Sequence, residues 1–205
     1  MTTIFNVASY ILDITGTITT MKLQKLAYYS QAYSLAATGH PLFNEDFQAW
    51  RNGPVCPELF ALHRGKFLIR KGELVIPNTE KLQDNSLTDV QKILVEKVCE
   101  KFAGYSGSDL SAMTHSEDPW KNAYDGANGS AICVQKITKD SLKDYYSTHN
   151  FLRQALRSRR CAVRAAFSIC NALLLMRCLS DQNSTCVSSL GRLRKKIRSK
   201  HHARE

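Results

Sequence analysis

The feature of this sequence that most constrains its fold is an abrupt change of charge near residue 150. Residues 1–150 contain 15 basic and 16 acidic side chains, a net charge of −1, whereas residues 151–205 contain 13 basic and 2 acidic ones, a net charge of +11. The bases change as well, from 12 Lys and 3 Arg to 3 Lys and 10 Arg. About 150 residues of balanced charge is a usual size for one domain. We therefore expect a domain over 1–150 and an Arg-rich basic tail over 151–205.

The composition of the whole chain is that of a globular protein in a reducing compartment. It is 43% hydrophobic and 22% charged, which excludes wholly disordered, collagen-like and rod-like chains. Its seven cysteines contain no pair in CxxC spacing, and residues 1–9 lack the basic start and long apolar run of a signal peptide. We therefore expect free thiols and a cytoplasmic protein.

The longest apolar run, residues 165–176, is too short for a membrane span. As a helix it would extend ~18 Å, whereas a bilayer core needs ~30 Å. We expect no membrane partner.

Capping residues and helical periodicity predict six or seven mostly short helices before residue 150. The expected ranges are 4–14, 20–39, 57–63, 88–104, 109–114, 117–124 and 138–146, with caps at Thr2 or Thr3, Thr20, Thr88, Ser108 and Thr138. Residues 47–51 predict a short strand or extended loop, 52–54 a turn, and 67–76 a small β-hairpin around Lys71 and Gly72. The expected fold class is mainly α, a compact helical bundle with this hairpin and a basic C-terminal extension, itself helical in part over 152–179.

Two motifs in the first third of the chain are candidates for binding. The segment from Lys22 to Ala32, KLQKLAYYSQA, places Lys22, Lys25 and Tyr29 on one side of a helix, where they suit an acidic partner. Its alternative is a set of core leucines below a solvated lysine face. The segment WRNGPV, from Trp50 to Val55, puts a large aromatic beside a rigid turn, as in interface anchors. More often such a tryptophan closes the edge of a core.

A third motif, HSEDPW from His115 to Trp120, invites a catalytic interpretation. His-x-Glu occurs in zinc deaminases, where the Glu transfers protons, and a small hydrolase or zinc enzyme using His115 and Glu117 is an alternative. The Pro-Cys-x-x-Cys half of that signature is absent, which leaves too few metal ligands. A helix start capped by Ser116 or Asp118 explains the segment better. We expect no enzyme, no metal and no cofactor, since phosphate-loop, nucleophile-elbow and zinc-protease motifs are also absent.

Taken together, in this order and at these separations, the three motifs resemble the Panacea domain, the SocA-like antitoxin domain of bacterial and phage proteins. The resemblance covers residues 4–147, and 137–146 is similar to the family's closing helix. It implies a compact, helical, non-enzymatic protein that binds and neutralises a cognate protein toxin encoded nearby, with delivery of the toxin to a protease as one mode. By the same resemblance, the partner-binding residues are Lys22, Gln24, Lys25, Tyr28, Trp50, Gly53, Pro54, His115 and Trp120.

The tail over 151–205 resembles nothing in that family. Its composition is what a reading-frame change or an appended cassette would produce, and our hypothesis is that it is not part of the evolved antitoxin. It also supports an alternative function, nucleic-acid binding, either as an autoregulator or through non-specific contacts that weaken with salt. The candidate phosphate contacts are Arg192, Arg194, Lys195, Lys196 and Arg198. This function ranks second because 1–150 shows no helix-turn-helix and the tail lacks interleaved aromatics.

Overall fold

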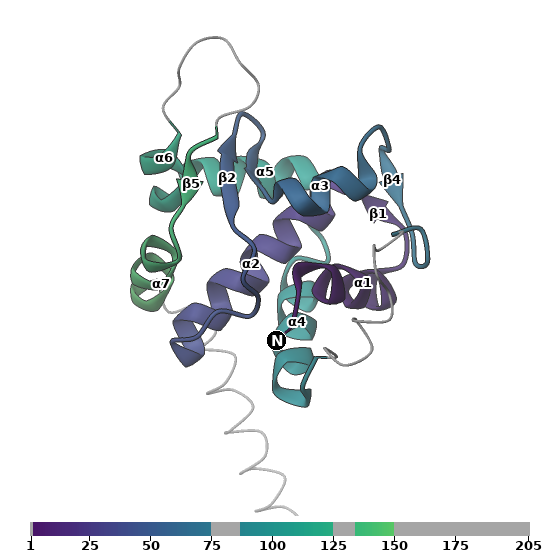
Figure 1. Cartoon of the computed structure of the whole chain (residues 1–205), viewed down its shortest axis with the longest axis horizontal. Coiled ribbons are helices and arrows are strands. Elements are labelled where there is room, and N and C mark those ends of the chain that lie inside the picture. The colour runs from purple at the N-terminus through teal and green to yellow at the C-terminus, as the bar shows by residue number, and fades with distance from the viewer. Residues whose placement is uncertain (1, 75–86, 125–133, 150–205) are drawn as a thin grey trace, which may run out of the picture. The chain divides into compact units, whose positions relative to one another are not determined.

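The computed structural model describes residues 2–74, 87–124 and 134–149 (Figure 1). In chain order the elements of these ranges are α1 (Ile4–Thr15), β1 (Ile18–Thr19), α2 (Thr20–Thr38), β2 (Phe47–Trp50), β3 (Gly53–Val55), α3 (Pro57–His63), β4 (Leu68–Ile69), α4 (Asp89–Lys101), α5 (Gly107–Ser116), α6 (Asp118–Ala123), β5 (Lys136–Ile137) and α7 (Lys139–Thr148). The mainly helical class is confirmed, with helices at each of the expected places in 1–150. The predictions for the tail lie outside the described residues.

Local sequence signals explain where the helices begin and end. At α4 the Thr88 hydroxyl accepts a hydrogen bond from the Gln91 amide, and the Gln91 side chain accepts one from the Thr88 amide, the predicted capping box. Helix α2 ends at Gly39, whose φ of 77° is the expected left-handed turn. The caps of α2 and α5 are Thr19 and Ser106, one and two residues before the predicted ones.

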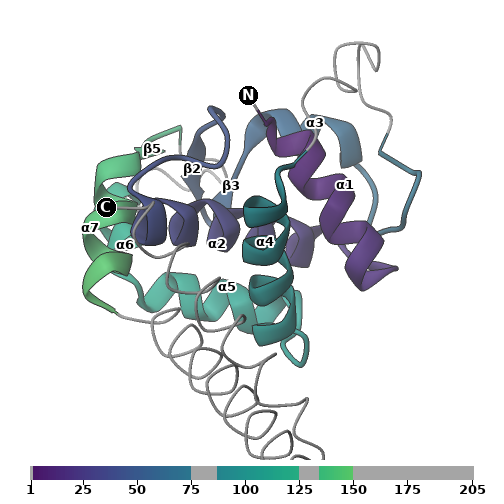
Figure 2. The same ribbon diagram turned by 90° about the horizontal axis from the view of Figure 1, so that it is seen from below.

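Helix α2 is the centre of the fold. It packs against α1, α4, α5 and α7, and Figures 1 and 2 show these helices arranged around it. Every residue from Leu23 to Leu35 is buried, so the helix has no solvated lysine face. The prediction of an exposed side carrying Lys22, Lys25 and Tyr29 is therefore wrong. Spacing along one helix does not reveal that other helices cover all of its faces.

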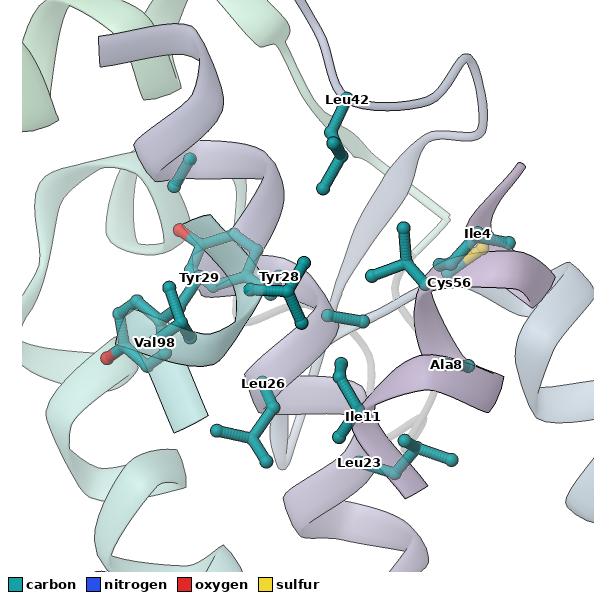
Figure 3. Close-up of a cluster of buried hydrophobic side chains, with 14 of the residues drawn as sticks. Ile4, Ala8, Ile11, Leu23, Leu26, Tyr28, Tyr29, Leu42, Cys56 and Val98 are labelled. Carbon is teal, nitrogen blue, oxygen red and sulfur yellow. The ribbon is translucent and has the colours of Figure 1, made fainter. Parts of the chain in front are cut away.

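The hydrophobic core joins the helices on both sides of α2. Figure 3 shows Ile4 and Ile11 of α1, Leu23 and Leu26 of α2, and Val98 of α4 in one cluster, and all five are at most 1% exposed. An interior of this density penalises the loss of even a few methylene groups. It therefore holds α2 in a fixed position.

Five short strands connect the helices within the described ranges. Strand β2 pairs antiparallel with β3, Trp50 opposite Gly53, and also with β5, giving the order β3-β2-β5. Strand β4 pairs with β1. This corrects the predicted hairpin over 67–76: the turn at Lys71 and Gly72 is formed, with the Glu73 amide donating to the Arg70 carbonyl at 3.1 Å, but the partner of β4 is β1. Residues 75 and 76 lie outside the described residues.

Candidate functional site

The turn that joins β2 to β3 is held by three different helices. Alternate carbonyl groups of the turn, at positions 50, 52 and 54, each accept a hydrogen bond from one side chain. These bonds are Trp120 Nε1 of α6 to Trp50 O at 3.0 Å, Ser111 Oγ of α5 to Asn52 O at 2.8 Å, and Lys25 Nζ of α2 to Pro54 O at 3.0 Å. The three sequence motifs thus meet at one hairpin, although they are up to 95 residues apart in the chain.

Gly53 makes this close approach possible. Its φ is +91°, a conformation that side-chain-bearing residues rarely adopt. A Cβ at this position would lie 2.7 Å from Lys25 Cε and 2.7 Å from Thr114 Oγ1. The glycine therefore lets the hairpin backbone lie against α2 and α5, which is a structural role.

Lys25 carries a buried amine that has no carboxylate beside it in the described ranges. Only 1% of the residue is exposed, and within the described ranges it forms no ion pair. Burial lowers the pKa of its amine from 10.5 to about 7. Burial also lowers the pKa of His115, and the positive charge of Lys25 lowers it further, against the effect of a backbone hydrogen bond at Arg51.

Gln24 fixes the start of α3 against α2. Its Oε1 accepts from the Cys56 amide at 2.9 Å, and its Nε2 donates to the Cys56 carbonyl at 3.3 Å. The same Nε2 lies 3.0 Å from His63 Nε2. Burial is the main cause that lowers the pKa of His63. The amide of Gln24 thus satisfies both backbone groups of a buried residue, which leaves it little capacity for an external partner.

A pocket of about 370 Å³ lies beside the hairpin. Helix α2, the hairpin and α3 contribute its lining residues, which are Thr20, Met21, Gln24, Lys25, Trp50, Asn52, Val55, Phe60 and His63. Trp50 packs edge-on against Phe60, with ring centroids 5.0 Å apart, and its Nε1 donates to Gln48 Oε1 at 2.8 Å. Three of the nine predicted partner-binding residues, Gln24, Lys25 and Trp50, therefore share this pocket.

The other predicted residues lie elsewhere. Lys22 donates from Nζ to the Ala103 carbonyl at 2.9 Å, and Tyr28 is fully buried with its ring edge-on to Phe47. The ring of Trp120 lies 4.0 Å from that of His115 and stacks on that of Tyr124 at 4.5 Å. Gly53 and Pro54 are buried in the hairpin. In this conformation these residues do not form one continuous surface.

Glu117 has a structural role that the sequence did not reveal. It is the N-terminal cap position of α6, but its side chain makes no capping bond, so neither Ser116 nor Asp118 is the cap. Its carboxylate accepts hydrogen bonds from Tyr146 at 2.5 Å and from Tyr29 at 3.2 Å, which joins α6 to α7 and α2. Burial raises the pKa of this carboxyl to about 7, although the tyrosine hydroxyls act in the opposite direction. Tyr29 was visible in the motif, but its distant partners were not.

Among the residues that the structure describes, no three His, Cys, Asp or Glu side chains gather as metal ligands, so His115 and Glu117 gain no third partner there. In the same part of the chain, no helix combines the length and the apolar character that crossing a bilayer requires.

A central buried helix, clamped to a β-hairpin by residues of three motifs, defines a small, mainly helical domain. Residues 23–121 match the family described as antitoxin SocA-like, Panacea domain. It is 29% identical over 143 residues to antitoxin SocA of Caulobacter vibrioides (strain NA1000 / CB15N), an alignment covering 62% of this chain and 72% of that protein. No solved structure matches the chain. The resemblance inferred from the three motifs is confirmed, and the matched range includes eight of the nine predicted residues, all but Lys22.

Proposed function

We propose that this protein is an antitoxin that acts in the cytoplasm and neutralises a protein toxin by binding it directly. The observation that carries the proposal is that the matched segment, 23–121, contains the hairpin and the three side chains that clamp it, those of Lys25, Ser111 and Trp120. The name of the matching family and that of the relative from Caulobacter both describe antitoxins.

The surface chemistry of the described residues suits recognition of a polypeptide. Trp50 and Phe60 are half-buried aromatic side chains at the pocket, the residue class that anchors protein interfaces. The net charge of −1 over residues 1–150 favours contacts that depend on shape and apolar burial over long-range attraction to phosphate. Direct binding can block the toxin itself or present it to a protease, and both routes begin with the same complex.

A growth-rescue experiment tests this proposal. The open reading frame next to the gene is expressed alone, with the full chain, and with the full chain carrying Gly53→Ala, which disturbs the hairpin. We expect toxicity from the neighbour alone, relief by the full chain and weaker relief by the variant. A harmless neighbour, or a toxic one that the full chain does not relieve, would contradict the proposal.

The same cells separate the two routes. The half-life of the toxin is followed after protein synthesis is stopped, with and without the full chain. A shortened half-life identifies delivery to a protease, whereas an unchanged half-life with restored growth identifies blocking. Our proposal requires one of the two together with a complex that co-purifies.

Nucleic-acid binding is a second candidate because the tail has a net charge of +11. The proposed contacts, Arg192, Arg194, Lys195, Lys196 and Arg198, lie outside the described residues. Binding of this kind should weaken steeply between 50 and 200 mM salt, by about a thousandfold for six or more phosphate contacts. Affinity for duplex DNA that persists in the fragment 1–150 would show that the domain, and not the tail, binds it.

A further inference from the structure

The ammonium group of Lys25 has hydrogen-bonding capacity that the described residues leave unused. A lysine ammonium carries three donors, and one of them is bound to the Pro54 carbonyl at 3.0 Å. No hydrogen bond among the described residues uses the other two, although the residue is only 1% exposed. Buried charges in proteins are normally paired or coordinated, and no carboxylate of the described ranges pairs with this one.

Two other polar side chains in the pocket lining already have partners. Gln24 is bound to Cys56 and contacts His63, and the indole N–H of Trp50 is bound to Gln48. The remaining lining includes the apolar side chains of Met21, Val55 and Phe60. The pocket therefore offers, beside apolar surface, one amine with unused donors that a bound anion would hold in its charged form.

We propose that this pocket binds a segment of the partner protein in which an apolar side chain lies beside a carboxylate. The carboxylate accepts the free donors of Lys25, and the apolar side chain packs on Met21, Trp50 and Phe60. The volume of about 370 Å³ is within the range of specific binding pockets and accommodates one large side chain. The identity of the occupant as a toxin rests on the proposed function.

Charge complementarity favours this occupant over a neutral peptide. Burial lowers the pKa of the Lys25 amine to about 7, so the empty pocket holds both its charged and its neutral form near neutral pH. A carboxylate in the pocket would stabilise the charged form as an ion pair in a low-dielectric environment, where the attraction is stronger than in water. A neutral amide of the same shape could accept a hydrogen bond but would leave the charge uncompensated. The pocket should therefore discriminate between the two by at least about tenfold in affinity.

A ligand titration of the full chain tests the pocket without any toxin. The probes are N-acetylphenylalanine, which carries a carboxylate, and N-acetylphenylalaninamide, which is neutral and of nearly the same shape. Methyl-labelled methionine provides an internal control, because Met21 lines the pocket and Met113 on α5 does not. We expect the Met21 methyl resonance to shift in a saturable way, about tenfold more weakly with the amide, and the Met113 resonance to stay in place.

Two variants assign the effect to Lys25. Lys25→Met should abolish the preference for the carboxylate, whereas Lys22→Met should retain it, since Lys22 is bonded to Ala103 and does not line the pocket. Equal affinity for both probes, no shift of Met21, or an unchanged preference in Lys25→Met would overturn the inference. The comparison of the two probes on the wild-type chain tests the inference even if Lys25→Met does not fold.

The rescue assay separates this inference from the antitoxin proposal. If the wild-type chain relieves toxicity and a folded Lys25→Met variant relieves it equally, the pocket inference fails and the antitoxin function stands. If the wild-type chain does not relieve toxicity, the antitoxin function fails and the titration alone decides the chemistry of the pocket. Rescue by wild type and Lys22→Met but not by Lys25→Met is the expected result.

Discussion

Replacing Lys25 by methionine should make the folded protein more stable at neutral pH. Methionine keeps the length and apolar stem of lysine, so the space between α2 and the hairpin stays filled. The substitution removes a charge that is 1% exposed and lacks an ionic partner in the described ranges. If Lys25 belonged to a buried ion pair, removing it would instead destabilise the protein, because its partner would be left as an uncompensated charge.

The magnitude follows from two opposing contributions. Burial lowers the pKa of the amine from 10.5 to about 7, which corresponds to a cost of ~5 kcal/mol when the amine is charged. Removing the amine also leaves the Pro54 carbonyl without its 3.0 Å donor, which costs about 1–3 kcal/mol. The expected net gain in the free energy of unfolding at pH 7 is therefore about 2–4 kcal/mol.

The gain should depend on pH in a defined direction. Between pH 7 and 10.5 the unfolded chain holds a proton on Lys25 that the folded chain has released, so raising the pH stabilises the wild type. The advantage of Lys25→Met should shrink by about 1.4 kcal/mol per pH unit across this window. The pKa of the neighbouring His115 lies below its usual 6.5, outside the window.

Urea unfolding of the full chain at pH 7, 8 and 9 measures this effect. The matched control is Lys22→Met, which removes the same charge from a half-buried position and should change the unfolding free energy by no more than about 1 kcal/mol at any of these pH values. A Lys25→Met variant that is less stable than the wild type at pH 7, or whose difference from it does not vary with pH, would refute the reasoning.

Three further predictions use circular dichroism melts of the same protein. Gly53→Ala should destabilise the folded protein by about 2 kcal/mol more than Gly16→Ala does. Both glycines have positive φ, but of the two only Gly53 has atoms within 4 Å of the position that a Cβ would occupy. Equal losses of stability would contradict the close approach at Gly53. Glu117→Gln should remove a loss of stability, about 2–3 kcal/mol, that this carboxyl causes in the wild type as pH rises from 4.5 to 7, since burial raises its folded-state pKa to about 7. The lowered pKa values of His63 and His115 act in the opposite direction in both proteins, so the test is the difference between wild type and variant, and a difference that is the same at pH 5 and 7.5 would argue against the prediction. The fragment 1–150 should melt at least as high as the full chain, and a fall of many degrees would show that the tail belongs to the fold.

The elements that the sequence predicted best depend on local chemistry. Capping boxes and a C-terminal glycine act within a few residues, so α4 and the end of α2 were placed correctly from the chain alone. The pairing of β4 with β1 was missed because it joins positions about 50 residues apart, and the two-residue strands carry no alternation to read.

The sequence identified individual residues of the candidate site, but it did not predict how they are arranged in space. The residue types at Lys25, Trp50 and Gly53 stood out, but helical spacing placed Lys25 on an exposed face. A helix that is covered on all sides has no exposed face, so its sequence shows no periodic alternation of apolar and polar residues that would mark one. Helix α2 is such a helix. The direction of a side chain on it becomes known only when the helices around it are in place.

Because the three motifs form one clamped unit, a match to the family does not separate residues that build the hairpin from residues that bind a partner. The sign of a stability change can separate them. Gly53 and Gln24 make contacts that only the fold uses, so replacing either should lower stability and impair binding only as a consequence. Lys25 places a charge in the core without an ionic partner in the described ranges, so its removal should raise stability while weakening recognition of a carboxylate. Opposite signs for stability and binding at one residue, and equal signs at the other two, would identify which part of the motif serves the partner.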